Sequence, residues 1–360
     1  MRTCTCHLVT ALVAGLMAMP LAACGGDSEA GTDSFAVGLL LPSRAVPRWE
    51  QSDKPLLEKR LKELCPHCTM EYANAENDAT RQRQQMMSMI TKGVRVLILD
   101  AADTRALRSS IQEADKAGVR VVAYDRLAEG PISGYVSFDG AQVGRLQGEA
   151  LLKAMGDKAY GGNVVMMNGD PTSPNAAWFR RGAMSVITGK VKIARSYDTV
   201  DWSTEKAHTN MSAAIAALGP DRIGGVLAAN DSIAAGVISA LKSARVRKLP
   251  PVTGQDADLD AVQRIVKGEQ YMTVYKPFRA EAAAAVAMAV ALGRGEDLRG
   301  VTTTTTDSPT TKDIPSVLLT PRTVTVANIK QTLLKDGVYT VDQICTRELR
   351  PACYKAGLAR

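Results

Sequence analysis

The sequence has few aromatic residues and very few histidines. Phe, Trp and Tyr together make up 4% of its 360 residues, and the only histidines are His7, His67 and His208. Histidine is the side chain that most readily moves protons near neutral pH, and it is the commonest metal ligand. Its scarcity argues against catalysis or metal binding built on imidazole.

Motifs for common enzyme chemistry are absent as well. There is no Gly-x-Ser-x-Gly nucleophile turn, no Gly-x-x-x-x-Gly-Lys-Ser/Thr phosphate loop and no Gly-x-Gly-x-x-Gly after the first predicted strand. The formal charge of +7 comes from dispersed basic residues, which argues against nucleic acid as a partner. We therefore predict no catalytic residue, no cofactor and no bound metal. A pair of carboxylates acting on a glycosidic bond stays open as the alternative.

Long hydrophobic runs are also missing, apart from a short one near the N-terminus. Met1-Arg2 precedes the apolar residues 8–19, a stretch shorter than the roughly 20 residues that a membrane-spanning helix needs. Leu21-Ala22-Ala23-Cys24 follows, and this order of charged, apolar and small residues is typical of a secretory signal. We predict a signal peptide over residues 1–23.

Residues 21–24 resemble the bacterial lipobox, in which the cysteine becomes the first residue of the mature chain and carries acyl groups. The resemblance implies lipidation of Cys24 and an extracytoplasmic protein anchored to the cell membrane. A chance cysteine after an ordinary signal is the alternative. Residues 24–34 are small and acidic without apolar periodicity, which predicts a flexible linker behind the anchor.

Four cysteines remain once the signal and the lipidation site are set aside: Cys65, Cys68, Cys345 and Cys353. Disulfides persist in exported proteins, so an even number predicts two bridges. Three connectivities are possible, and the simplest pairs Cys65 with Cys68 and Cys345 with Cys353. A redox motif at 65–68, or half a zinc site with His67, is the alternative. A redox motif opens a helix after a strand, whereas this one follows a predicted helix.

From residue 35 onward, short apolar runs alternate with longer amphipathic segments. The first five candidate strands occupy residues 35–41, 69–73, 96–99, 119–123 and 135–138. A second series of about five lies between residues 163 and 274. This alternation is typical of parallel sheets built from β-α units. It predicts an α/β protein of two doubly wound, Rossmann-like domains, with a single eightfold barrel as the competing layout.

Polar and aromatic side chains gather just after the predicted strands, where ligands of doubly wound sheets bind. The candidate ligand-binding residues are Arg48, Trp49, Asp125, Arg126, Trp202, Asn230, Asp256 and Lys276, with Asn175 and Arg180 on a nearby predicted helix. Carboxylates and amide oxygens accept hydrogen bonds from sugar hydroxyls, Arg and Lys donate to them, and indole rings cover apolar C–H faces. This mixture indicates a monosaccharide ligand.

Each of these positions also has an ordinary structural explanation. Trp49 and Trp202 could pack in a core, while Asp103, Asp201 and Asp231 stand where helices begin and could cap them. The coincidence of polar and aromatic groups at several strand ends favours the functional interpretation.

Longer motifs occur in a regular order between about residues 35 and 338. They are Ala123-Tyr124-Asp125-Arg126, Tyr135-Val136-Ser137-Phe138-Asp139, Asn230-Asp231, Gly254-Gln255-Asp256-Ala257-Asp258-Leu259, Met272-Thr273-Val274-Tyr275-Lys276-Pro277 and Ile314-Pro315-Ser316-Val317-Leu318-Leu319-Thr320-Pro321. They resemble the xylose-binding proteins of bacterial ABC sugar importers, in the type I periplasmic binding protein family. The resemblance implies two lobes joined by three hinge crossings, near residues 138–140, 274–277 and 313–317. It implies the same ten ligand-binding residues.

The resemblance also implies how the chain is divided. Residues 35–138 with 277–313 would form the N-terminal sugar-binding lobe, and residues 139–276 with 314–340 the C-terminal lobe. The Cys-containing tail, residues 341–360, departs from the family pattern. So does the loop 42–47, which would contact the sugar. D-Xylose is therefore the first expectation, and glucose, galactose or arabinose are the alternatives.

The partners implied are a monosaccharide, the transmembrane permease subunits of an ABC importer, and the membrane through the lipid anchor, with the protein a monomer. A rival hypothesis is a sugar sensor that docks on a membrane histidine kinase.

Overall fold

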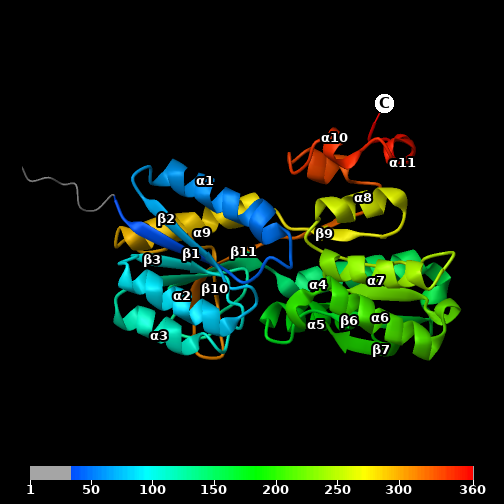
Figure 1. Cartoon of the computed structure of the whole chain (residues 1–360), viewed down its shortest axis with the longest axis horizontal. Helices are drawn as coiled ribbons and strands as arrows, with labels where there is room; N and C mark the ends of the chain where they lie inside the picture. The colour runs from blue at the N-terminus through cyan, green and yellow to red at the C-terminus, as the bar shows by residue number, and fades with distance from the viewer. Residues whose placement is uncertain (1–33, 360) are drawn as a thin grey trace, which may run out of the picture.

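The computed structural model describes residues 34–359 and divides them between two α/β lobes that lie side by side (Figure 1). The predicted signal peptide, the lipidation site Cys24 and all of the linker except Ser34 lie outside the described residues. Each lobe has a parallel sheet with helices on both faces. The predicted fold class, two doubly wound domains rather than one barrel, is confirmed.

The first lobe contains a seven-stranded sheet in the order β10-β11-β5-β4-β3-β1-β2. The strands are β1 Ala36–Leu41, β2 Thr69–Asn74, β3 Val96–Leu99, β4 Arg120–Tyr124, β5 Gly134–Phe138, β10 Thr304–Thr306 and β11 Ile314–Leu319. Neighbouring strands are parallel except at the edge, where β10 runs antiparallel to β11. The carboxyl ends of the parallel strands therefore share one edge of the sheet.

Helices cover both faces of this first sheet. They are α1 Lys54–Leu64 and α9 Phe278–Gly293 on one face, and α2 Ala79–Thr91 and α3 Arg108–Lys116 on the other (Figure 1). In β3, Val96 and Ile98 belong to the core cluster with α1 and α9, and Leu97 and Leu99 to the cluster with α2 and α3. Alternate residues of a strand face opposite sides, so a strand covered on both faces is apolar throughout.

The second lobe is built on a three-stranded parallel sheet, β7-β6-β8. Its strands are β6 Asn163–Asn168, β7 Lys192–Asp198 and β8 Gly225–Ala228, and a separate pair joins β9 Thr273–Tyr275 to β12 Arg322–Val324. Its helices are α4 Gly140–Met155, α5 Pro174–Ile187, α6 Thr204–Leu218, α7 Asp231–Ser243 and α8 Leu259–Lys267. A Cβ atom at Gly144 would lie 2.0 Å from the carbonyl oxygen of Phe179, so only glycine lets α4 and α5 approach this closely.

The chain passes between the lobes three times, and one predicted crossing is wrong. The first crossing follows β5 and the second follows β9. The third was expected near residues 313–317, but β11 pairs with β5 in the first sheet along Ser316 to Leu319. Because a strand that pairs with β5 belongs to the first sheet, the chain leaves the first lobe only after Leu319. We propose residues 35–138 with 277–319 as the first lobe.

The last part of the chain packs on the second lobe. The short helices α10 Val341–Ile344 and α11 Arg350–Lys355 lie over α8, and their apolar side chains form one core cluster with it (Figure 1). The Cys345–Cys353 disulfide joins the end of α10 to α11. Within residues 34–359, no helix has both the length and the apolar character to cross a membrane.

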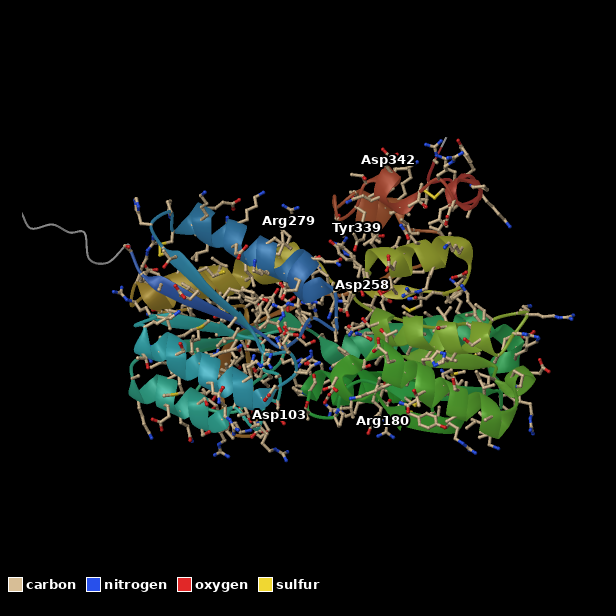
Figure 2. The ribbon with its side chains drawn as sticks, viewed as in Figure 1. Asp103, Arg180, Asp258, Arg279, Tyr339 and Asp342 are labelled. Carbon is tan, nitrogen blue, oxygen red and sulfur yellow. A yellow bond between two sulfur atoms is a disulfide. The ribbon has the colours of Figure 1, made fainter. Side chains whose placement is uncertain are left out.

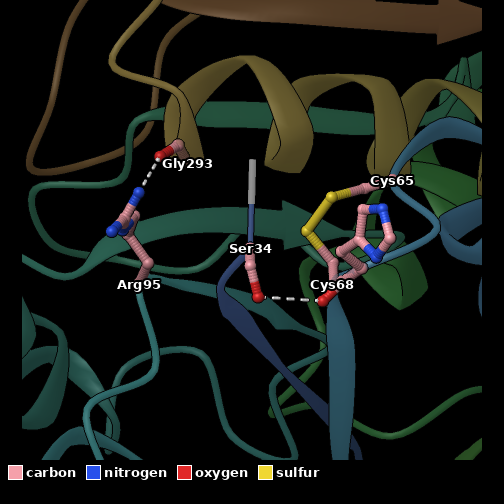
Figure 3. The surroundings of a disulfide bond; sticks show 6 residues. Ser34, Cys65, Cys68, Arg95 and Gly293 are labelled. Atoms are coloured by element: carbon pink, nitrogen blue, oxygen red, sulfur yellow. Dashed lines mark hydrogen bonds between the residues drawn. A yellow bond between two sulfur atoms is a disulfide. The ribbon is translucent and has the colours of Figure 1, made fainter. Parts of the chain in front are cut away.

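The second disulfide, Cys65–Cys68, closes the turn between α1 and β2 (Figure 3). At the same turn the Ser34 hydroxyl donates a hydrogen bond to the His67 carbonyl at 3.1 Å. The Cys-x-x-Cys segment thus follows a helix and precedes a strand, which is not the helix-opening position of a redox motif. Both bridges follow the simplest of the three connectivities.

Candidate functional site

The carboxyl ends of the two sheets face each other, and the residues there enclose a small cavity. Its lining is mostly polar or aromatic: Val46, Arg48, Trp49, Asp125, Arg126, Asn175, Phe179, Trp202, Asn230, Gln255, Asp256 and Lys276. The cavity has a volume of about 20 Å³. Every lining residue is at most 6% exposed, so the wall of the cavity is buried between the lobes.

Most lining residues stand where a strand has just ended. Arg48 and Trp49 come from the segment after β1, Asp125 follows β4, Asn230 lies just beyond β8, and Lys276 follows β9. Parallel strands place their carboxyl ends at one edge of a sheet, and two such edges facing each other gather these residues from distant parts of the chain. Strand position therefore accounts for most of the residues that line this cavity.

Three lining residues have a left-handed backbone: Asp125 with φ 56°, Trp202 with φ 55° and Asp256 with φ 102°. Residues that carry a Cβ atom rarely adopt this conformation, and when they do the surrounding structure must hold them there. Such strain is concentrated at functional sites. Here it occurs in both lobes, at the turns that carry two acidic side chains and an indole into the cavity wall.

Arg48 lies at the centre of a buried ion network. Its Nε and Nη2 atoms donate to the Asp53 carboxylate at 3.0 and 2.7 Å, Nη2 also donates to Glu281 at 2.8 Å, and Nη1 donates to Asp125 at 2.8 Å. Burial disfavours the charged guanidinium, but the three carboxylates outweigh it, and the pKa of Arg48 lies well above its usual range. Arg48 therefore remains a cation that orients the Asp125 side chain.

The buried carboxyl groups divide into two kinds. Burial raises the pKa of Asp53 and of Glu281 in spite of the attraction of Arg48. Burial acts on Asp125 in the same direction, but Lys276, Arg48 and Arg126 outweigh it, and the pKa of Asp125 lies below its usual range. Asp125 is therefore the ionised acceptor of the first lobe, available to a ligand hydroxyl.

Polar contacts join the lobes across the cavity. The Asn175 amide nitrogen in the second lobe donates to Asp125 Oδ1 in the first at 2.7 Å. Lys276, at the second crossing, places its Nζ atom 2.8 Å from Asp256 Oδ1 and 3.6 Å from Asp125 Oδ2. These are the kinds of interaction that the hydroxyl groups of a ligand could replace one by one.

Five buried polar atoms on the lining residues have no hydrogen-bond partner among the described residues, and one of them, Asp256 Oδ1, forms an ion pair with Lys276. The other four are two donors, Trp49 Nε1 and Trp202 Nε1, and two acceptors, Asn175 Oδ1 and Gln255 Oε1. Each parent residue is at most 6% exposed. An unpaired buried polar atom costs about 1–3 kcal/mol, so such atoms are rare in folded proteins. Donors and acceptors gathered in one place indicate a ligand that is both donor and acceptor.

Aromatic rings provide the apolar part of the wall. Trp49 comes from the first lobe and Trp202 from the second, and the Phe179 ring meets Trp202 edge to face at 6.3 Å. The Arg48 guanidinium lies over Trp49, 4.1 Å from the ring centroid. Indole rings in opposite walls suit a flat ligand with apolar C–H faces.

One predicted site residue, Arg180, does not line this cavity. It is exposed and lies at the lower edge of the second lobe in the view of Figure 2. Asn175 and Phe179 are four residues apart on α5 and share a face, whereas Arg180 is turned about 100° further round the helix. Arg180 was predicted because it lies in the same sequence motif as Asn175, and the prediction did not take account of the helical repeat of about 3.6 residues. All of the other predicted ligand-binding residues line the cavity.

Three lining residues were missed: Val46, Phe179 and Gln255. Helical spacing from Asn175 would have indicated Phe179. Gln255 stands beside Asp256 in a motif already noted. Nothing in the local pattern singles out Val46, which lies in the loop 42–47.

Three aspartates with alternative explanations lie away from the cavity lining. Asp103 accepts from the backbone amides of Arg105 and Ala106, as a cap does. Asp201 pairs with Lys206. Asp231 is buried among hydrogen-bond donors of the second lobe. In the part of the chain that the structure describes, no three or more His, Cys, Asp and Glu side chains are grouped to hold a metal ion.

Comparison with known proteins identifies a family model and relatives with similar sequences. Residues 37–297 match the family model described as periplasmic binding protein domain. The D-xylose-binding periplasmic protein of Escherichia coli is 35% identical over 86% of this chain and 92% of its own length. The multiple sugar-binding periplasmic receptor ChvE of Rhizobium radiobacter is 33% identical over 87% and 93%.

A solved structure adds the three-dimensional comparison. An ABC transporter solute-binding protein from Clostridium phytofermentans, with bound β-D-glucose, superimposes with a TM-score of 0.79 at 32% identity. The match covers 86% of this chain and 99% of that one. The chain therefore belongs to the type I periplasmic binding protein family, in the group that includes the sugar-binding proteins of bacterial ABC transporters.

Proposed function

We propose that this protein captures one monosaccharide, with D-xylose as the first choice, between its lobes and delivers it to the permease of an ABC importer without changing it chemically. The observation that carries the proposal is the set of unpartnered polar atoms beside the two indoles. Trp49 and Trp202 supply donors, and Asn175 and Gln255 supply acceptors. A pyranose offers matching hydroxyls around its rim and apolar C–H groups on its faces.

Charged residues complete the recognition. Asp125 and Asp256 accept from sugar hydroxyls, and Arg126 and Lys276 line the same cavity as donors. Hydrogen bonds that involve a charged partner are about twice as strong as neutral ones, and burial removes the competition of water. The ligand itself need carry no charge, because each cation of the site already pairs with a carboxylate: Arg48 with Asp125, Arg126 with Asp100 and Lys276 with Asp256.

Capture requires the lobes to move. The residues that line the cavity are all buried between the lobes, so the lobes must separate to admit a sugar. At the rim, the Thr172 hydroxyl of the second lobe donates to the Ala102 carbonyl of the first at 3.4 Å, and the Thr104 hydroxyl donates to the Thr172 carbonyl at 3.4 Å. Long bonds of this kind break easily. The three crossings then act as a hinge, and the permease distinguishes the closed, loaded form.

The identity of the sugar depends on a few side chains. Relatives with similar sequences are described as binding D-xylose or multiple sugars, and a similar structure holds β-D-glucose. Val46, in the divergent loop 42–47, lines the cavity beside Trp49. We propose that this loop decides between a pentose and a hexose.

Isothermal titration calorimetry of the purified mature domain tests the proposal. The panel is D-xylose, D-glucose, D-galactose and L-arabinose, with mannitol as a control that lacks the ring. We expect binding of one molecule per chain and no change in the recovered sugar. Absence of heat with every monosaccharide would refute the sugar assignment, and chemical conversion of the sugar would refute the transport role.

The membrane anchor is proposed on sequence grounds alone, since Cys24 lies outside the described residues. Cells that express the full chain should incorporate a fatty-acid label, and Cys24→Ser should abolish the label and release the protein. Labelling that persists in the variant would place the anchor elsewhere. Light scattering of the soluble domain tests the further proposal that it is a monomer.

A further inference from the structure

The loop Gln255 to Asp258 carries two residues of the candidate site, Gln255 and Asp256, and two of its residues have an unfavourable backbone conformation. Asp256 has φ 102° and Ala257 has φ 56°, and both are nearly fully buried. Residues with a Cβ atom avoid this region unless other contacts hold them in it. The positions of Gln255 and Asp256 in the cavity therefore depend on what fixes the backbone around them.

Hydrogen bonds from the second lobe hold the amides of this loop. The amide of Asp256 donates to the Val274 carbonyl at 2.9 Å, and that of Ala257 donates to Thr273 Oγ1 at 3.1 Å. The amide of Asp258 donates to Asp231 Oδ2 at 3.0 Å. These three amides of the loop thus all donate hydrogen bonds to acceptors within the second lobe.

Asp231 serves as an anchor for these contacts. Besides the Asp258 amide, it accepts from Gln270 Nε2 at 2.7 Å and from Thr273 Oγ1 at 2.8 Å. Thr273 therefore donates to Asp231 while it accepts from Ala257. Since Asp231 directly follows the cavity residue Asn230, the same carboxylate connects two segments of the site wall.

An acceptor of the loop is held from a different part of the chain. The Tyr339 hydroxyl donates to the Ala257 carbonyl at 2.9 Å. Tyr339 lies just before the C-terminal helices and near Asp258 (Figure 2). Burial, followed by the nearby carboxylates of Asp258 and Asp231, raises the pKa of Tyr339, so its hydroxyl keeps the proton that it donates.

The segment that carries Tyr339 is itself firmly attached. Thr340 and Gln343 form a reciprocal capping box at the start of α10. Ile344, Leu349 and Cys353 are buried in one cluster with residues of α8, and the Cys345–Cys353 disulfide closes the segment. The capping box, the apolar packing and the disulfide therefore hold the segment next to Tyr339 in place.

We propose that Tyr339 is a positioning residue for sugar binding: the C-terminal segment holds the Ala257 carbonyl and thereby keeps Asp256 and Gln255 in the geometry that accepts the ligand. The proposal rests on the proposed sugar-binding function and deepens it. It assigns a role in ligand affinity to Tyr339 and the C-terminal helices that support it, none of which contributes a side chain to the cavity lining.

The test compares Tyr339→Phe with Tyr354→Phe in the mature domain. The first variant removes only the donated hydroxyl and leaves the ring in its apolar cluster. The second removes the hydroxyl of a tyrosine in the same tail that is 54% exposed. We expect the dissociation constant for D-xylose, or for whichever aldose of the panel wild type binds, to rise about 3- to 10-fold in Tyr339→Phe, the loss typical of one hydrogen bond. Tyr354→Phe should bind as wild type does.

A second measurement separates positioning from a general loss of stability and needs no sugar. Amide hydrogen exchange of the ligand-free protein should speed up at residues 256–258 in Tyr339→Phe and stay unchanged in β8. Unaltered affinity in Tyr339→Phe, or weaker affinity without faster exchange at 256–258, would overturn the proposal. Absence of sugar binding in wild type would instead refute the proposed function, and the exchange result would still report whether Tyr339 holds the loop.

Discussion

Replacing Arg48 by methionine should destabilise the protein strongly and in a pH-dependent way. Arg48 is 2% exposed and neutralises Asp53, Glu281 and Asp125 through four hydrogen bonds. Methionine matches the uncharged stem of the arginine side chain and can still pack in the same apolar surroundings. The substitution therefore removes the charge and its donors while it retains much of the packing, and three carboxyl groups are left buried without their common cation.

The expected magnitude follows from that geometry. Removing one partner of a buried ion pair typically costs about 3–5 kcal/mol, because the other partner remains buried and uncompensated. Lys276 lies 3.6 Å from Asp125 and moderates the loss there, but Asp53 and Glu281 depend on Arg48. We therefore expect a decrease of about 3–5 kcal/mol in the free energy of unfolding at pH 7.5.

The loss of stability in Arg48→Met should depend on pH. Loss of Arg48 raises the folded-state pKa of Asp53 and Glu281 further above their unfolded values of about 4. A carboxyl with a raised folded pKa contributes stability below its unfolded pKa, and this contribution is lost as the pH rises through the folded pKa. The deficit of Arg48→Met should therefore be smaller at pH 5.5 than at pH 7.5.

Urea unfolding followed by tryptophan fluorescence at both pH values measures the deficit. Arg105→Met is the matched control, since the Arg105 side chain is 86% exposed and its only ion pair among the described residues is a 3.7 Å contact with Glu129. We expect the control to stay within about 0.5 kcal/mol of wild type. A deficit below 1 kcal/mol for Arg48→Met, or the same deficit at both pH values, would contradict the reasoning about buried charge.

Three further predictions concern the site and its surroundings. Trp49→Ala and Trp202→Ala should each weaken sugar binding by about 1–3 kcal/mol in calorimetry, by analogy with aromatic stacking on flat ligands, and unchanged affinity in both would remove the indoles from the site. Asn175→Ala should weaken binding at least fivefold, because it removes a cross-lobe donor and an unpartnered acceptor. Arg180→Ala, on the same helix, should leave the dissociation constant unchanged. Equal effects of the two substitutions would contradict the placement of α5. Burial raises the pKa of Asp231 to about 7, so this carboxyl contributes stability that is full below about pH 4 and lost as the pH rises through 7. Asp231→Asn should therefore flatten the dependence of the unfolding midpoint on pH between 5 and 8, and an equally steep profile would show that Asp231 does not titrate there.

Much of the fold could be predicted because its determinants are local. A strand such as β3 has only apolar residues, Val96–Leu99, and lies between predicted amphipathic helices, which is sufficient to indicate a parallel sheet with both faces covered. The third crossing was wrongly predicted because the position of β11 depends on a long-range contact. Ile314–Leu319 pairs with β5, some 180 residues earlier in the chain, and no local pattern of residues records which sheet a late strand will join.

The candidate site could be predicted to a similar extent and for a related reason. Strand ends are local features, and the edge of a parallel sheet brings them together whatever the loops between them contain. Phe179 depends on which face of α5 meets the cavity, and the contact between Tyr339 and Ala257 joins residues 82 positions apart. Such contacts depend on the packing of one element on another, which the order of residues along one segment does not report.

In the proposed function, Lys276 couples sugar binding to closure of the lobes. It stands at the second crossing, in an ion pair with Asp256 of the second lobe at 2.8 Å and within 3.6 Å of Asp125 of the first. Separation of the lobes must weaken one of these contacts and break the 2.7 Å bond between Asn175 and Asp125. In the open form water solvates the separated groups, whereas in the closed form a sugar hydroxyl can bridge them. The ligand therefore favours closure because its hydroxyls bond to both lobes at once, and a ligand that reached only one lobe would bind without closing the hinge.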